Sequence, residues 1–157
     1  MNSRRRRGFH CGTDRGGRYS FVHQDSLPLP VVAAVVERDG RVLLAQRPEH
    51  KHLARKWEFP GGKVESGETP EAALIREIRE ELNCEICVIR PLPRSTHTYD
   101  RGTIEMIPFV CRLAPDSPEP KPAEHLALAW VRPDELAGYD VAAADLPVVA
   151  ALQTPVA

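Results

Sequence analysis

The sequence has no long apolar run, although 42% of its 157 residues are hydrophobic. The longest uncharged, apolar-rich stretch is Leu27 to Val36, which is ten residues long and contains two prolines. A helix that spans a membrane needs about 20 consecutive apolar residues. The basic N-terminus is not followed by an apolar segment, so we expect no signal peptide, no membrane partner and a cytoplasmic location.

Cysteine is also scarce. Four residues, Cys11, Cys84, Cys87 and Cys111, are too few for the disulfide framework of a small secreted domain. Cys84 and Cys87 form one C-x-x-C pair, whereas a structural zinc site needs a second pair at matching spacing. We expect this pair to lie in a strand, where buried thiols act as small hydrophobic groups rather than as a metal or redox site.

The formal net charge is only −1, but the charges are distributed unevenly. Residues 1–26 hold six Arg and two Asp, whereas residues 27–157 hold 15 basic and 20 acidic side chains. The first segment lacks an apolar period and is rich in Gly, Ser and Arg, which predicts a disordered basic tail before a single domain over residues 27–157. The run Arg4–Arg7 could contact nucleic acid, but such runs are usually solvated tails, and we expect no stable nucleic-acid partner.

The rest of the chain predicts a mixture of α and β structure. Two aliphatic runs, 31–36 and 42–45, flank Asp39-Gly40, which is a strong hairpin signal. Further strands are expected at 57–59, 84–89, 104–113 and 127–131, with Pro60-Gly61-Gly62 ending the first of these and beginning a loop. Asp134 and Asp145 are expected to open two short helical segments, the second ending near Leu152.

The helix predicted after Thr69 is the most informative element. Thr69 suits the N-cap, Pro70 the first helical position, and Asn83 the left-handed position that follows a helix ending near Leu82. One face of this helix is apolar, formed by Leu74, Ile75, Ile78 and Leu82. The neighbouring face gathers three carboxylates, those of Glu77, Glu80 and Glu81.

These three glutamates repel one another. At about 5 Å and an effective dielectric of about 20, each pair costs about 3 kcal/mol before salt screening. Only Arg76 and Arg79 lie near enough on the helix to offset that repulsion. The pattern is compatible with a solvated face, and equally with a site for Mg²⁺ or Mn²⁺, because both ions prefer carboxylate oxygens.

Residues 62–84 resemble the signature of the Nudix hydrolases, G-x5-E-x7-R-E-U-x-E-E-x-G-U, where U is a bulky aliphatic residue. The matching positions are Gly62, Glu68, Arg76-Glu77-Ile78 and Glu80-Glu81. Asn83 replaces the final Gly and Cys84 the last aliphatic residue, and both replacements preserve the turn and its apolar neighbour. The resemblance covers about residues 31–152 and is closest to the MutT-like branch, which hydrolyses nucleoside triphosphates.

The resemblance implies an α+β fold, an α/β/α sandwich whose mixed sheet has helices on both sides. It also implies hydrolysis of a nucleoside triphosphate to a monophosphate and pyrophosphate with Mg²⁺, or with Mn²⁺. Glu77, Glu80 and Glu81 would bind the metal, with the Gly62 carbonyl and Glu124 completing its shell. The general base would be Glu77 or Glu124, and Arg76 would orient Glu77.

The substrate contacts are less specific. Arg47 and Lys63 are candidate phosphate contacts, and Phe59 could flank the base. Asp145 either accepts hydrogen bonds from a base or caps the helix that follows it. Its acceptors favour a (deoxy)cytidine triphosphate or an oxidised nucleotide such as 8-oxo-dGTP.

Three further points stay open at this stage. Cleavage of a dinucleoside polyphosphate, at which Tyr99 hints, or of ADP-ribose is one alternative activity. A catalytically silent, nucleotide-sensing regulator is another interpretation of the same fold, although the intact glutamates argue against it. We expect a monomer or a homodimer.

Overall fold

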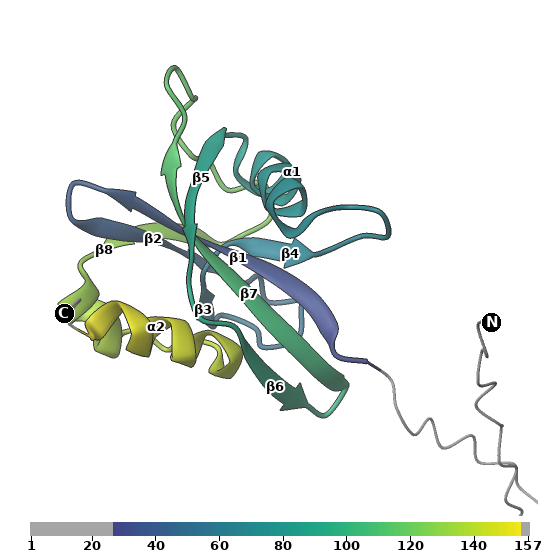
Figure 1. Ribbon diagram of the computed structural model, residues 1–157. Coiled ribbons are helices and arrows are strands. Elements are labelled where there is room, and N and C mark those ends of the chain that lie inside the picture. The colour runs from purple at the N-terminus through teal and green to yellow at the C-terminus, as the bar shows by residue number, and fades with distance from the viewer. Residues whose placement is uncertain (1–26, 155–157) are drawn as a thin grey trace, which may run out of the picture.

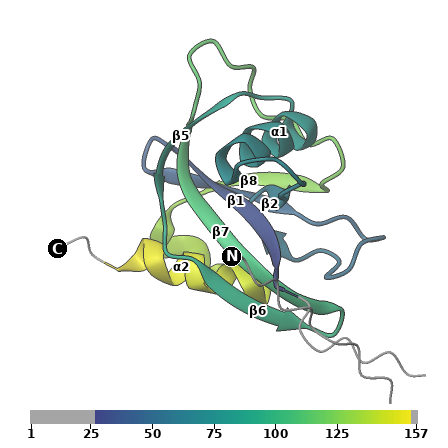
Figure 2. The ribbon, with the colours of Figure 1, turned by 45° about the vertical axis from the view of Figure 1, so that its right-hand side comes forward.

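The computed structural model describes residues 27–154 and shows an eight-stranded mixed sheet with helices on both faces (Figures 1 and 2). The predicted tail over residues 1–26 lies outside the described residues. The strands are β1 (Leu29–Arg38), β2 (Arg41–Gln46), β3 (Trp57–Glu58), β4 (Gly61–Lys63), β5 (Ile86–Pro91), β6 (Ser95–Tyr99), β7 (Gly102–Leu113) and β8 (Ala127–Val131). The helical elements are α1 (Pro70–Leu82), the 3-10 turns η1 (Pro133–Gly138) and η2 (Ala143–Asp145), and α2 (Leu146–Gln153).

Strand β1 is the centre of the sheet. It pairs in parallel with β7, forms an antiparallel hairpin with β2, and pairs antiparallel with β4 through Val32 and Gly62. Its side chains alternate between two cores, with Val32, Ala34 and Val36 on one side and Ala33 and Val35 on the other. A strand buried on both faces needs a covering layer on each side, which the helices supply.

Helix α1 covers one face and begins and ends where the sequence predicts. The Thr69 hydroxyl accepts a hydrogen bond of 3.2 Å from the Ala72 N–H. Asn83 adopts the left-handed conformation, with φ 52° and ψ 35°, and closes the last turn. Leu74, Ile78 and Leu82 are fully buried, so the predicted apolar face is confirmed.

Helix α2 covers the opposite face, where Val148 and Val149 pack in the same core as Ala33 and Val35. The hairpin of β1 and β2, the strand β8 and the two short helical segments are also confirmed. No helix within residues 27–154 is long and apolar enough to cross a membrane.

Three local expectations were wrong. Gly61–Lys63, expected to be a loop, forms β4, because its glycines pack directly against the β1 backbone. The sequence does not predict the polar strand β6. This strand forms an antiparallel hairpin with β7, and its last residue, Tyr99, pairs with Gly102, the first residue of β7. Cys84 is buried but precedes β5 instead of lying in it. Cys87 lies in β5 but is exposed, because the buried Ile86 side chain places its neighbour on the opposite face of the strand.

Gly61 provides a test of this close packing. A Cβ at Gly61 would overlap the carbonyl oxygen of Val32, whereas a Cβ at Gly138 would meet no atom within 4 Å. We expect Gly61→Ala to lower the free energy of unfolding by about 3 kcal/mol, because neither backbone can yield without breaking the β1–β4 pairing. Gly138→Ala should change it by less than about 1 kcal/mol. Urea unfolding of both variants measures the difference, and equal stabilities would contradict the packing described.

Candidate active site

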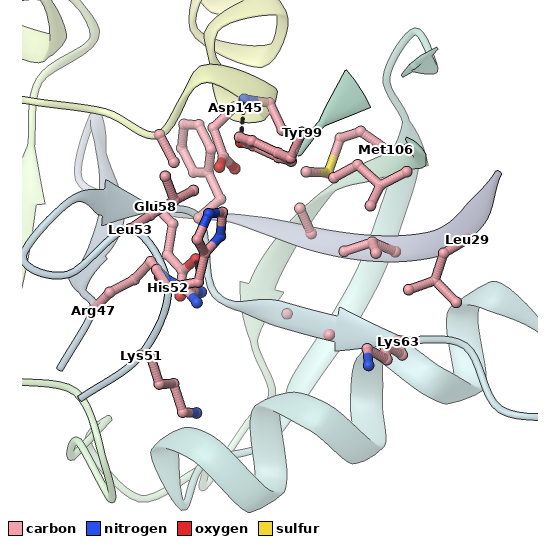
Figure 3. A pocket seen from close by; sticks show the side chains of 18 of the residues that line it. Leu29, Arg47, Lys51, His52, Leu53, Glu58, Lys63, Tyr99, Met106 and Asp145 are labelled. Carbon is pink, nitrogen blue, oxygen red and sulfur yellow. Dashed lines mark hydrogen bonds and ion pairs between the residues drawn. The ribbon is translucent and has the colours of Figure 1, made fainter. Parts of the chain in front are cut away.

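A cavity of about 550 Å³ opens between β1, β4, the 47–53 loop, the β6–β7 hairpin and η2. Glu81 lies in its wall against the backbone of Gly61, and Asp145 lies in its wall against the backbone of Phe59. Arg47, His52 and Glu58 gather on one side of it, and Tyr99 lies next to Asp145 (Figure 3). The cavity therefore extends from Glu81 of α1 to Asp145 at the start of α2.

Arg76 organises the glutamates of α1. Its Nε and Nη2 donate to the two carboxylate oxygens of Glu68, each at 2.8 Å. Its Nη1 donates to Glu77 at 3.0 Å and to Glu80 at 3.4 Å. The hydrogen bonds from Arg76 and one from the Glu65 N–H lower the pKa of Glu68 to about 2. Arg76 thus compensates the like charges that the sequence places together, and it holds Glu77 in one orientation.

Glu77 lies against β4. A Cβ on Gly62 would fall on the Glu77 carboxyl group, so only glycine allows the strand and the carboxylate to come this close. Burial raises the pKa of Glu77, while the hydrogen bond from Arg76 opposes the shift. The backbone of Gly62 and the carboxylate of Glu77 are therefore neighbours, as binding of one ligand by both requires.

Glu81 lacks the cationic partner that the other two carboxylates have. Its Oε2 is buried and has no hydrogen-bond partner. Burial raises the pKa of Glu81 to about 7, the charges of Glu58 and Glu77 add to the shift, and His125 and the Gly61 N–H oppose it. A buried carboxylate that is costly to ionise fits a site for a hard cation, whose charge would lower that cost.

Glu80 and Glu124 are exposed and paired with cations. Glu80 contacts Arg76, and Glu124 lies 2.9 Å from the Nζ of Lys51. Within residues 27–154, no three His, Cys, Asp or Glu side chains form a group that could hold a metal ion. The structure thus places Glu77 beside Gly62 and Glu81 beside Gly61. Glu80 and Glu124 are in ion pairs that must open before either could join them.

Asp145 lies at the junction of η2 and α2. It is 4% exposed, its Oδ1 has no partner, and it makes no capping hydrogen bond to α2. The capping role considered for it was therefore wrong. Burial raises the pKa of Asp145 well above its usual value, and the charge of Glu58 adds to the shift. Next to it, the Ala144 N–H donates to the Tyr99 hydroxyl at 2.9 Å, which fixes this wall of the cavity (Figure 3).

The remaining predicted contacts are also at the cavity. Phe59 is buried and Lys63 is exposed, and both line the cavity. Arg47 donates from Nη1 to Glu58 at 2.9 Å and from Nε to the His52 carbonyl at 2.8 Å. The structure therefore brings all of the predicted substrate contacts to one hollow.

Two site residues were missed. Glu58 was regarded only as part of a strand, and His125 was not considered. The His125 Nε2 lies 3.1 Å from a Glu58 oxygen, and 67 positions separate the two in the chain. The available signal for Glu58 was strand alternation, which places it on the opposite face from Trp57 and Phe59.

Residues 31–151 match the family model described as the NUDIX domain. The chain belongs to this family. It is 41% identical over 124 residues to the CTP pyrophosphohydrolase of Escherichia coli, covering 78% of this chain and 90% of that protein. It is 40% identical over 76 residues to the 8-oxo-dGTP diphosphatase of Proteus vulgaris, covering 48% of this chain and 68% of that protein.

A solved structure agrees with the fold. The MutT NUDIX hydrolase of Burkholderia pseudomallei superposes with a TM-score of 0.68 at 31% identity, covering 80% of this chain and 98% of that one. The predicted family and the sandwich of a mixed sheet between helices are thereby confirmed.

The raised pKa of Glu81 predicts how stability depends on pH. Its carboxyl group titrates near 4.5 when unfolded and at about 7 when folded. The folded chain therefore binds this proton more tightly, and the stability gained from it is present below pH 4.5 and lost as the pH rises through 7. Without metal, the free energy of unfolding of the wild type should fall by about 3 kcal/mol over this pH range. Glu81→Gln has no carboxyl group at this position, so we expect it not to show this fall.

Urea unfolding at several pH values in EDTA measures this effect. The curve of Glu81→Gln should meet the wild-type curve at low pH and lie above it at pH 8. Glu71→Gln, a change at an exposed position in the first turn of α1, serves as the control and should follow the wild type. Parallel curves for the wild type and Glu81→Gln would contradict the burial cost.

Proposed function

We propose that this protein hydrolyses nucleoside triphosphates to a nucleoside monophosphate and pyrophosphate with the help of Mg²⁺ or Mn²⁺. The single observation that carries the proposal is the Glu81 carboxylate, which lies in the last turn of α1 against the Gly61 N–H of β4 and whose buried Oε2 has no hydrogen-bond partner. The names of the relatives, a CTP pyrophosphohydrolase and an 8-oxo-dGTP diphosphatase, support the same reaction.

Glu81 and Glu77, with the Gly62 carbonyl, would hold the metal. Glu80 and Glu124 would join once their ion pairs with Arg76 and Lys51 open, and exposed ion pairs of this kind cost little to open. A bound divalent ion would neutralise phosphate oxygens and activate a water molecule. Arg76 holds Glu77 in place, and Glu77 or Glu124 is the candidate general base.

The phosphate chain would contact Arg47 and Lys63. Both residues line the cavity that also contains Glu81 and Asp145 in its wall. The guanidinium of Arg47 uses Nε and Nη1 on protein oxygens, which leaves Nη2 for an anion. Planar guanidinium groups suit phosphate oxygens because their donors are fixed in direction.

The base would contact Asp145. With its pKa raised by burial, Asp145 can be a neutral acid, which has one donor and one acceptor. That pair matches the ring nitrogen and amino group of cytosine, whereas an ionised carboxylate accepts only and matches the two N–H groups of a guanine-type base. CTP-type and oxidised guanine substrates are both compatible with the site, and the protonation state selects between them.

A nucleotide panel tests the proposed activity. We expect pyrophosphate release from CTP, dCTP or 8-oxo-dGTP with Mg²⁺, and loss of more than about 100-fold in kcat for Glu81→Gln, because a direct ligand counts for more than an outer partner. Glu71→Gln should retain wild-type kcat. Release of other products from ADP-ribose or dinucleoside polyphosphates would favour those substrates, and tight binding without turnover would favour a regulator.

A cytoplasmic location and a monomeric or homodimeric state stay predictions.

The pH dependence of base preference tests the role of Asp145. In the wild type, the ratio of kcat/KM for CTP to that for 8-oxo-dGTP should fall by about tenfold as Asp145 ionises with rising pH, since the loss of one base contact costs about this much. In Asp145→Asn, the amide keeps one donor and one acceptor, so the ratio should not change with pH. The ratio cancels titrations that act on both substrates. An unchanged wild-type ratio would contradict the assignment.

A further inference from the structure

His125 lies in the cavity wall and is not explained by the reaction described above. Its side chain is 6% exposed, and its Nδ1 is buried without a partner. Its Nε2 lies 3.1 Å from Oε1 of Glu58. His125 and Glu58 are 67 positions apart in the chain. Their contact is therefore maintained by tertiary packing.

Glu58 is held at both of its oxygens. His125 contacts Oε1, and Nη1 of Arg47 donates to Oε2 at 2.9 Å. Arg47 is fixed a second time, because its Nε donates to the His52 carbonyl at 2.8 Å. A guanidinium held at two of its donors cannot rotate, so its remaining edge keeps one direction.

Glu58 also lies close to two other carboxyl groups, those of Glu81 and Asp145. Its charge raises the pKa of Glu81 on one side and that of Asp145 on the other. With the Nε2 contact removed, Glu58 would be held only by Nη1 of Arg47. The carboxylate and the guanidinium could then turn together about the one contact that remains, from Nε of Arg47 to the His52 carbonyl. The contact from His125 therefore decides where the free edge of Arg47 points.

We propose that His125 is a positioning residue that, through Glu58, fixes Arg47 to bind the phosphate chain of the nucleotide. This inference rests on the proposed function for the identity of the ligand. The sequence of contacts is His125 Nε2 to Glu58, Glu58 to Arg47 Nη1, and Arg47 to the anion. His125 itself does not touch the substrate.

Two substitutions separate the two ring nitrogens. In His125→Gln the side-chain amide nitrogen can replace Nε2, whereas in His125→Asn it can replace only Nδ1. We expect His125→Asn to raise KM for the triphosphate about tenfold with kcat nearly unchanged, as for the loss of an outer partner of a binding group. His125→Gln should stay close to the wild type. Equal defects in the two variants would overturn the proposal.

A second readout does not depend on turnover. Calorimetry with an α,β-methylene nucleoside triphosphate should show the same tenfold weakening for His125→Asn, and no further weakening when it is combined with Arg47→Ala. Full additivity of the two substitutions would overturn the proposal, because His125 would then act independently of Arg47. If the wild type hydrolyses no nucleotide but binds the analogue with this coupling, the proposed reaction fails while the positioning role stands. Thermal unfolding of each variant checks that a loss of binding is not a loss of fold.

Discussion

The site depends on how closely β4 approaches both β1 and α1. Gly61 and Gly62 occupy positions where a Cβ would overlap the backbone of Val32 and the carboxyl group of Glu77. Because these two residues carry no side chain, the helix carboxylates lie directly against the strand, and the Gly61 N–H reaches Glu81. The same contact closes the sheet beneath α1, so packing and the arrangement of acidic groups have one origin.

That close packing brings four glutamate side chains near one another, and a cationic partner offsets the repulsion for three of them but not for Glu81. The guanidinium of Arg76 contacts Glu68, Glu77 and Glu80. Glu81 lies deeper and receives no such contact, so burial raises its pKa to about 7. A group that is costly to ionise in the folded chain is one whose ionisation a bound cation can drive. The uncompensated carboxylate of Glu81 is therefore the group that indicates a cation site.

The sequence predicts those features of the fold and the site that depend on residues close together in the chain. The cap at Thr69, the left-handed Asn83 and the apolar face of α1 are short-range patterns, and all three occur in the structure. Strand β4 was missed because Gly61-Gly62 has the composition of a loop, and only its pairing with β1 makes it a strand. The contact of His125 with Glu58 joins segments 67 positions apart, and no local pattern indicates it.

Glu58 links the two ends of the cavity. Its charge raises the pKa of Glu81 at the α1 end and of Asp145 at the α2 end. The two ends are consequently not independent, since any displacement of this carboxylate changes the cost of ionising both. Tyr99 acts at the α2 end as well, because its hydroxyl accepts a hydrogen bond from the Ala144 N–H beside Asp145 and the charge of Glu58 contributes to the raised pKa of Tyr99.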